Sequence, residues 1–230
     1  MKQTILVVAA HPDDEILGCG GTIAWHAARG DLVHILILGE GATSRDANRK
    51  VETRQPELDA LNQTAIKSSK ILGAQSIHFA SLPDNRMDSI PLLDIVKIVE
   101  NYVSQFKPQT LYTHHFGDLN LDHRLTQQAV ITACRPQPHS CVKELFFFET
   151  PSSTEWQCTG SSTVFQPHYF VDISKTWNLK LEALRIYQAE MREWPHSRSI
   201  EAIESLAKWR GASIGVNAAE GFSVGRIIRN

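Results

Sequence analysis

Short apolar runs alternate with longer amphipathic stretches along the first 135 residues. The apolar runs predict four buried strands, at residues 4–10, 32–38, 77–80 and 110–113. The amphipathic stretches repeat apolar positions at helical spacing and predict four helices, at residues 16–29, 52–72, 92–106 and 123–134. This alternation predicts an α/β fold of the Rossmann-like, doubly wound kind, with a mostly parallel sheet flanked by helices.

The pattern becomes less regular after residue 135. We expect a strand at 142–148, a pair of short strands at 164–166 and 169–172, and helices at 178–191 and 200–210. The chain has no Pro-, Gly- or Ser-rich linker and no internal repeat. A single domain over 1–230 is therefore expected, with an α/β core (1–135) and a C-terminal β/helical extension (136–230) that shapes the pocket.

Composition narrows the classes of partner. The chain is 42% hydrophobic and 21% charged, and its formal net charge is −2. That charge argues against a broad basic face for nucleic acid and against an electrostatic membrane anchor. Apolar runs all stay below the roughly 18 residues that a membrane span needs, and the four cysteines form no Cys-x-x-Cys pair. We expect a cytoplasmic protein that binds a small molecule, and its oligomeric state is left open.

Two clusters of polar residues follow predicted strands. His11-Pro12-Asp13-Asp14-Glu15 comes directly after the first strand. The stretch 113–124 follows the fourth strand and contains six further candidates: His114, His115, Asp118, Asn120, Asp122 and His123. In an open α/β sheet, ligands bind beyond the carboxyl ends of the strands, so both clusters are expected at one edge. The crowded carboxylates there require a positive charge.

A zinc ion meets that requirement. Zn²⁺ takes imidazole nitrogens and carboxylate oxygens and keeps one position open in catalytic sites. His11 and Asp14, three residues apart across a turn, can reach one ion, and His123 can supply a third bond. A carboxylate beside the bound water, such as Asp13, can act as general base. Asp122 can orient a ligand imidazole from outside the coordination sphere.

Two other interpretations of the first cluster explain less. Carboxylates favour the positive end of a helix, which accounts for Glu15 but not for the histidine before the proline. Gly18, Gly20 and Gly21 suggest a dinucleotide-binding turn, but in that turn the glycines precede the helix without intervening carboxylates. Close packing of the helix on the sheet explains these glycines better.

The motifs resemble those of a known family. "AAHPDDE", "LGCGGT" and a downstream Asp-His are similar to the PIG-L/LmbE-like family of zinc-dependent N-acetylglucosaminyl deacetylases. Further matches are "ILG" at 71–73, "LPDNRMD" at 82–88 and "AEGF" at 219–222. The resemblance implies that zinc binds His11, Asp14 and His123, with Fe²⁺ and Mn²⁺ as alternatives, and that Asp13 is the general base.

The resemblance also suggests substrate contacts. Asp84 stands where relatives contact sugar hydroxyls, and Arg86 and Asp118 are further candidates for binding substrate. Many members read His-Pro-Asp-His at the second motif, whereas this chain has Asn120-Leu121-Asp122-His123. Asn120 can donate to an oxyanion but cannot carry a proton.

The departures from the family pattern leave two points open. The acid role is left to Asp13, His114 or His115. Residues 61–64 lack the Arg-x-x-Glu of many members, and Arg54 is one possible substitute for its arginine.

The resemblance, together with the two polar clusters, implies a metal-dependent N-deacetylase that releases acetate from an N-acetylglucosamine-type amino sugar or glycoconjugate. In the loop at 194–199, His196 and Arg198 are expected to help select the substrate, unless the loop is an ordinary surface turn. Two alternatives stay open: a metal-dependent hydrolase of another bond, such as a phosphoester, and a metal- or sugar-binding protein without turnover.

Overall fold

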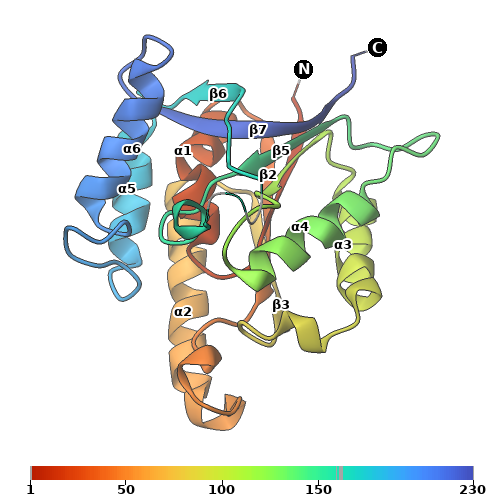
Figure 1. Ribbon diagram of the computed structural model, residues 1–230. Helices are drawn as coiled ribbons and strands as arrows, with labels where there is room; N and C mark the ends of the chain where they lie inside the picture. The colour runs from red at the N-terminus through yellow and green to blue at the C-terminus, as the bar shows by residue number, and fades with distance from the viewer. Residues whose placement is uncertain (1, 159, 161–162, 230) are drawn as a thin grey trace.

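The computed structural model describes residues 2–158, 160 and 163–229 and contains one seven-stranded sheet (Figure 1). The strand order is β3-β2-β1-β4-β5-β7-β6. The strands are β1 (Thr4–Ala9), β2 (Leu32–Gly39), β3 (Ser76–Leu82), β4 (Thr110–His114), β5 (Glu144–Phe148), β6 (Tyr169–Asp172) and β7 (Ala219–Ile227). The first five are parallel, and β7 pairs antiparallel with both β5 and β6.

Helices cover both faces of this sheet. They are α1 (Asp14–Ala28), α2 (Val51–Ile71), α3 (Leu92–Phe106), α4 (Leu121–Ala133), α5 (Trp177–Ile186) and α6 (Ile200–Ala212). Figure 1 shows α1, α2, α5 and α6 on one side of the sheet and α3 and α4 on the other. The predicted fold class is confirmed: a doubly wound, mostly parallel α/β sheet.

The central strand shows why its sequence is apolar throughout. Ile5 and Val7 of β1 belong to the core on the α1 side, whereas Leu6 and Val8 belong to the core on the α3 side. Successive side chains of a strand point to opposite faces, and helices cover both faces here. The residues that face one side of the sheet are therefore apolar, and so are the residues between them that face the other side. Together they give the continuous apolar run in the sequence.

The C-terminal third differs from the expectation in three places. The predicted pairing of 164–166 with 169–172 is wrong, because residues 163–168 form no strand and β6 pairs with β7 instead. Strand β7 was not predicted. Helix α5 ends at Ile186, five residues earlier than expected. Among the described residues, no helix is both long and apolar enough to cross a membrane.

The order of the strands places the site. From β1 the chain enters α1 on one face of the sheet, and from the neighbouring β4 it enters α4 on the other face. A crevice opens between two such diverging connections, at the carboxyl ends of the strands. Both polar clusters of the sequence follow these two strands, and so they meet at this crevice.

Candidate metal centre

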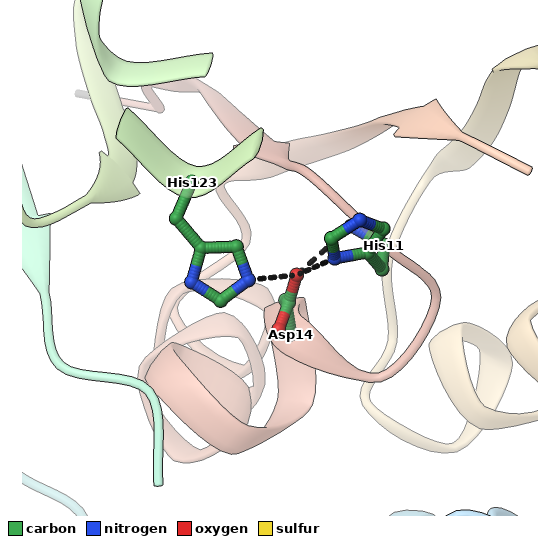
Figure 2. Close-up of side chains that lie close together, drawn as sticks. All are labelled: His11, Asp14 and His123. Atoms are coloured by element: carbon green, nitrogen blue, oxygen red, sulfur yellow. Dashed lines mark hydrogen bonds and ion pairs between the residues drawn. The ribbon is translucent and has the colours of Figure 1, made fainter. Parts of the chain in front are cut away.

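Three side chains from the two clusters converge at the crevice. His11 lies two residues after β1, Asp14 is the first residue of α1, and His123 lies in the first turn of α4. One potential ligand atom from each lies within 4.8 Å of the others. Figure 2 shows both imidazoles directed at the carboxylate of Asp14. The ring centroids of His11 and His123 are 5.4 Å apart, close enough for one ion to contact both.

Asp14 is at the centre of this group. Its Oδ2 atom lies 3.3 Å from His11 Nδ1 and 3.2 Å from His123 Nε2 (Figure 2). The same oxygen accepts a hydrogen bond from the backbone N–H of His11 at 2.8 Å. The Oδ1 atom of Asp14 is buried and has no hydrogen-bond partner among the described residues. A buried, unpartnered carboxylate oxygen needs a counter-charge, which a cation bound here would supply.

The second nitrogen of each imidazole faces another carboxylate. His11 Nε2 lies 3.0 Å from Asp122 Oδ2, and His123 Nδ1 lies 3.1 Å from Asp118 Oδ1. This arrangement is typical of metal-binding histidines, because the outer carboxylate fixes the orientation and tautomer of the ring. Asp122 thus contacts the imidazole of His11 rather than that of its neighbour in sequence, His123.

Asp118 is not placed to bind substrate, contrary to the expectation. Its side chain is fully buried and accepts hydrogen bonds from the hydroxyls of Ser153 and Thr154 as well as from the backbone N–H of Asn120. Its oxygens are therefore occupied by the protein, and one of them faces His123. The structure gives Asp118 a role in holding that ring.

Burial and the neighbouring carboxylates act in opposite directions on the pKa values of the two imidazoles. Burial disfavours a charged imidazole, but hydrogen bonds to Asp122 and Asp14 outweigh it and raise the pKa of His11 well above its usual value. The same competition raises the pKa of His123 to about 9 through Asp14 and Asp118. The carboxylates of Asp14, Asp118 and Asp122 thus favour positive charge at these two rings.

Asp13 lies beside this group in an unusual backbone conformation. Its φ is 109°, and its N–H donates to Glu15 Oε2 at 3.0 Å. Arg198 Nη1 donates to Asp13 Oδ2 at 2.6 Å, and Arg198 Nε donates to Ser152 Oγ at 2.5 Å. Burial raises the pKa of Asp13 to about 7, partly opposed by Arg198. The guanidinium expected only to help select the substrate thus binds the predicted general base.

A polar cleft of about 240 Å³ opens next to these residues. Its lining includes the predicted site residues His11, Asp13, Asp84, Asn120 and His123. Three charged lining residues were not predicted from the sequence: Arg45, Glu190 and Arg192. Arg45 Nη2 and Glu190 Oε1 form an ion pair at 2.8 Å between the segment after β2 and the segment after α5. No motif marks these residues, since the pairing depends on the fold.

The two candidates for substrate binding at the third strand differ. Asp84 lines the cleft, and its Oδ2 accepts the backbone N–H of Ser44 at 3.0 Å. Its Oδ1 lies 3.3 Å from His11 Nε2. Arg86, by contrast, is not among the residues that line the cleft, and its guanidinium donates to the backbone carbonyl of Ala47 at 3.1 Å. The expectation that Arg86 binds substrate is not supported by its position.

Asn120 lines the cleft and also begins α4. Its Oδ1 accepts the backbone N–H of Asp122 at 2.8 Å, which makes it the helix N-cap, and its Nδ2 donates to Asn85 Oδ1 at 2.9 Å. An amide nitrogen carries two hydrogens, so one donor is left for a ligand.

Of the two histidines proposed as acids, His114 stacks on the His123 ring with centroids 4.0 Å apart and lies 3.5 Å from Asp14 Oδ2. His114 Nε2 accepts the backbone N–H of Ala10 at 2.9 Å, and His115 Nε2 lies 2.9 Å from the carbonyl oxygen of Thr163. Both side chains are buried, and neither is among the residues that line the cleft. They are therefore poorly placed to protonate a leaving group there.

Helix α2 does contain an Arg-x-x-Glu pair, at Arg54 and Glu57, seven residues before the stretch 61–64 that lacks one. Arg54 Nη1 donates to Glu57 Oε2 at 2.7 Å, and the Arg54 guanidinium also binds Asp46. These contacts join the loop after β2 to the start of α2. Arg54 is not among the lining residues of the cleft, so it acts on the loop and not on a ligand.

Comparisons with known proteins agree with this geometry. The model of the PIG-L family, described as GlcNAc-PI de-N-acetylase, matches residues 6–134. An uncharacterized deacetylase of Escherichia coli K12, YaiS, is 28% identical over 195 residues, which are 82% of this chain and 92% of that protein. The diacetylchitobiose deacetylase of Thermococcus kodakarensis is 27% identical over 231 residues, covering 96% of this chain and 82% of that one.

A solved structure with a different activity is also similar. GalB, the 4-carboxy-2-hydroxymuconate hydratase of Pseudomonas putida KT2440, superposes with a TM-score of 0.73 at 27% identity. The match covers 100% of this chain and 99% of that chain. The fold and the arrangement of its elements are thus shared by enzymes that catalyse different reactions.

Proposed function

The chain belongs to the PIG-L family, and on that premise we propose that it is a metal-dependent N-deacetylase that releases acetate from an N-acetylated amino sugar or a conjugate of one. The matched residues include both polar clusters of the crevice. Two relatives that cover most of the chain are described as deacetylases, one of them for diacetylchitobiose. The observation that carries the proposal is the convergence of His11, Asp14 and His123 beside Asp13.

The residues at the crevice fit a divalent metal ion. Two imidazole nitrogens and a carboxylate form the donor set of many catalytic zinc sites, and Asp14 offers a buried oxygen without a partner. We infer zinc as the ion, while Fe²⁺ and Mn²⁺ accept the same donors. When bound, such an ion polarises a carbonyl oxygen and lowers the pKa of a water molecule.

Asp13 is the proposed general base. Its carboxylate lines the cleft beside His11 and His123, and Arg198 holds one of its oxygens at 2.6 Å. The other oxygen is left to accept a proton from a water molecule at the site. Because His114 and His115 lie outside the cleft, Asp13 is also the proposed group that returns this proton to the leaving amine.

Asn120 and Asp84 are proposed to contact the substrate. The remaining Nδ2 hydrogen of Asn120 can donate to the oxyanion that develops when the amide is attacked. Asp84 lines the cleft on the side of Ser44 and Asn85 and offers a carboxylate to sugar hydroxyls. Asp122 and Asp118 hold the two ligand imidazoles and do not contact the substrate in this proposal.

One bound ion per chain is expected, which argues against a two-metal phosphoesterase. A second group, His11, Asp84 and Asp122, could also hold an ion, but it shares His11 with the first. Two-metal sites need a separate ligand set about 3.5–4 Å away. His11 Nε2 lies 3.0 Å from Asp122 Oδ2, and a second ion at this nitrogen would have to displace that contact.

A hydratase is the second candidate function, because GalB is similar over the whole chain. The same crevice could activate water for addition to a carbon–carbon double bond. A hydratase consumes an unsaturated carboxylate without releasing acetate, whereas a deacetylase produces acetate and an amine in equal amounts. Product analysis therefore separates the two functions.

The proposal is tested by measuring acetate release from a panel of N-acetylated sugars with zinc supplied. The panel contains free N-acetylglucosamine, its nucleotide-linked, lipid-linked and malate-linked forms, and N,N'-diacetylchitobiose. We expect zinc-dependent release of acetate from at least one compound, and no release by an Asp14→Ala variant. Absence of acetate from the whole panel, together with hydration of an unsaturated carboxylate, would favour the second candidate. A cytoplasmic location stays a prediction from the sequence.

A further inference from the structure

Helix α1 is broken at Cys19, five residues after Asp14. The backbone of Cys19 has φ −147° and ψ 26°, which are not helical, and the helix continues beyond it to Ala28. The part before the break, residues 14–18, carries Asp14 on its first turn. So short a helical segment is not stable by its own hydrogen bonds, because helix nucleation is unfavourable. Other parts of the chain must hold it in place.

Two charged side chains occupy the break. Lys180 of α5 donates from Nζ to the backbone carbonyl of Leu17 at 3.0 Å. Glu220 of β7 accepts the backbone N–H groups of Gly21 at 2.9 Å and Thr22 at 2.7 Å, as well as the Thr22 hydroxyl at 2.6 Å. Lys180 Nζ and Glu220 Oε1 also form an ion pair at 2.6 Å.

These contacts match what a broken helix needs. The end of the first part leaves carbonyl oxygens without partners, and the start of the second part leaves N–H groups without partners. A cation beside the former and an anion beside the latter also have the favourable sign for the two helix dipoles. Thr176 adds a hydrogen bond from its hydroxyl to the carbonyl of Gly21 at 2.9 Å.

Burial makes this ion pair unusual. Lys180 is 3% exposed and Glu220 is 6% exposed. An isolated buried ion pair often contributes no more to stability than apolar residues of the same volume would. Here the two charges also satisfy backbone groups at the break, which apolar residues could not do. The ion pair therefore satisfies backbone groups on both sides of the break in α1.

The glycines of "LGCGG" allow the close packing around the break. A Cβ at Gly18 would overlap the ring of Phe148, and a Cβ at Gly21 would lie 2.8 Å from Ile173 Cδ1. The broken helix thus lies directly against β5 and the segment after β6. This packing accounts for the glycines that superficially suggested a dinucleotide-binding turn.

We propose that Lys180 and Glu220 are positioning residues for the metal centre. By holding the break in α1, they fix residues 14–18 so that Asp14 Oδ2 lies 3.2–3.3 Å from both ligand imidazoles. The inference rests on the proposed metal centre. It assigns a role to "AEGF", the C-terminal motif that the reaction itself does not use, and it explains how the C-terminal extension reaches a site built by the first 135 residues.

The experiment measures the dissociation constant for zinc by competition with a chromophoric chelator. Lys180→Met removes the charge and the donor while keeping a chain of similar length, and Thr22→Val removes one hydrogen bond to Glu220 while keeping the shape. Val99→Ala, in the core on the opposite face of the sheet, is the control for lost stability alone. All variants are measured well below their unfolding temperatures.

We expect Lys180→Met to weaken zinc binding by about tenfold or more, as loss of an orienting partner of a metal ligand does. Thr22→Val should weaken it to a smaller extent, and Val99→Ala should bind zinc as the wild type does. If Lys180→Met does not fold, the zinc dissociation constant of Thr22→Val tests the positioning role. Wild-type affinity in the folded variants of Lys180 and Thr22 would overturn the positioning role and leave the metal centre intact. If the wild type bound no zinc, both the metal centre and this inference would fail.

Discussion

At the scale of single residues, Asp13 combines a strained backbone with a buried carboxylate. A φ of 109° is rare for a residue with a Cβ and costs on the order of 1–3 kcal/mol, so it persists only where the surroundings enforce it. Here the hydrogen bond to Glu15 and the ion pair with Arg198 enforce it. In this backbone conformation, the Asp13 side chain lines the cleft while the Asp14 side chain faces the two histidines.

Replacing Asp13 by Asn should separate metal binding from turnover. Asn has nearly the same shape but cannot accept a proton, and general-base catalysis typically contributes about 10²–10⁴-fold to the rate. We predict that Asp13→Asn keeps its zinc and loses at least about a hundredfold in kcat. Acetate assays and elemental analysis of the same sample check this. A variant with nearly normal kcat would show that another residue is the base.

His26, in the last turn of α1, provides a test of pH dependence. Burial lowers its pKa, although Asp31 partly opposes this. Below its unfolded pKa of about 6.5, the unfolded chain binds the proton more readily than the folded one, so the protein loses stability as the pH falls. The His26→Gln variant has no imidazole at this position and therefore lacks this contribution to the loss of stability.

Urea unfolding of both proteins across this pH range measures the effect. We predict that the wild type loses more free energy of unfolding on acidification below about pH 6.5 than His26→Gln does. Since both proteins retain the other histidines, the difference between them reports His26 together with its partner Asp31. Parallel curves for the two proteins would show that His26 keeps its ordinary pKa.

At the scale of elements, the packing of α1 on β5 depends on Gly18. An added methyl group would overlap the Phe148 ring, and overpacking of this kind typically costs about 1–3 kcal/mol. We predict this loss for Gly18→Ala in urea unfolding. Gly20→Ala is the matched control, because its methyl group would come no closer than 3.1 Å to a neighbouring atom, Ile16 Cγ2, whereas at Gly18 it would overlap the Phe148 ring. Equal stabilities of the two variants would contradict the packing argument.

The elements whose apolar residues recur at a regular spacing were predictable from the sequence. Helix α3 has the predicted bounds, and the strands from β1 to β4 lie within two residues of their predicted starts and ends. Strand β7 was missed because its sequence, AEGFSVGRI, has two glycines and no sustained alternation. Its pairing with β5 and β6 is long-range and leaves no local signal. Helix α5 ends early, where Tyr187 binds Glu15 and Glu190 binds Arg45.

The candidate site was predictable only in part. The two local motifs suffice to suggest the convergence of His11, Asp14 and His123, since both follow parallel strands. The partners of these residues depend on side-chain directions that spacing does not fix. Thus Asp122 faces His11, and Asp118 faces His123.

At the scale of the whole molecule, the C-terminal extension completes a site that the first 135 residues begin. Arg198 holds Asp13, Tyr187 donates to Glu15, and Lys180 and Glu220 occupy the break in α1. All of these contacts join residues more than 160 positions apart in the sequence. Both parts of the chain therefore contribute contacts to the centre.

The central claim is that side chains from two distant parts of the chain together hold one divalent ion. The most direct test is the zinc content of the purified, dialysed protein, measured by elemental analysis for the wild type and for His123→Ala. We predict one zinc ion per wild-type chain and almost none in the variant. Retention of a full equivalent by His123→Ala, or its absence from the wild type after incubation with zinc, would contradict the account.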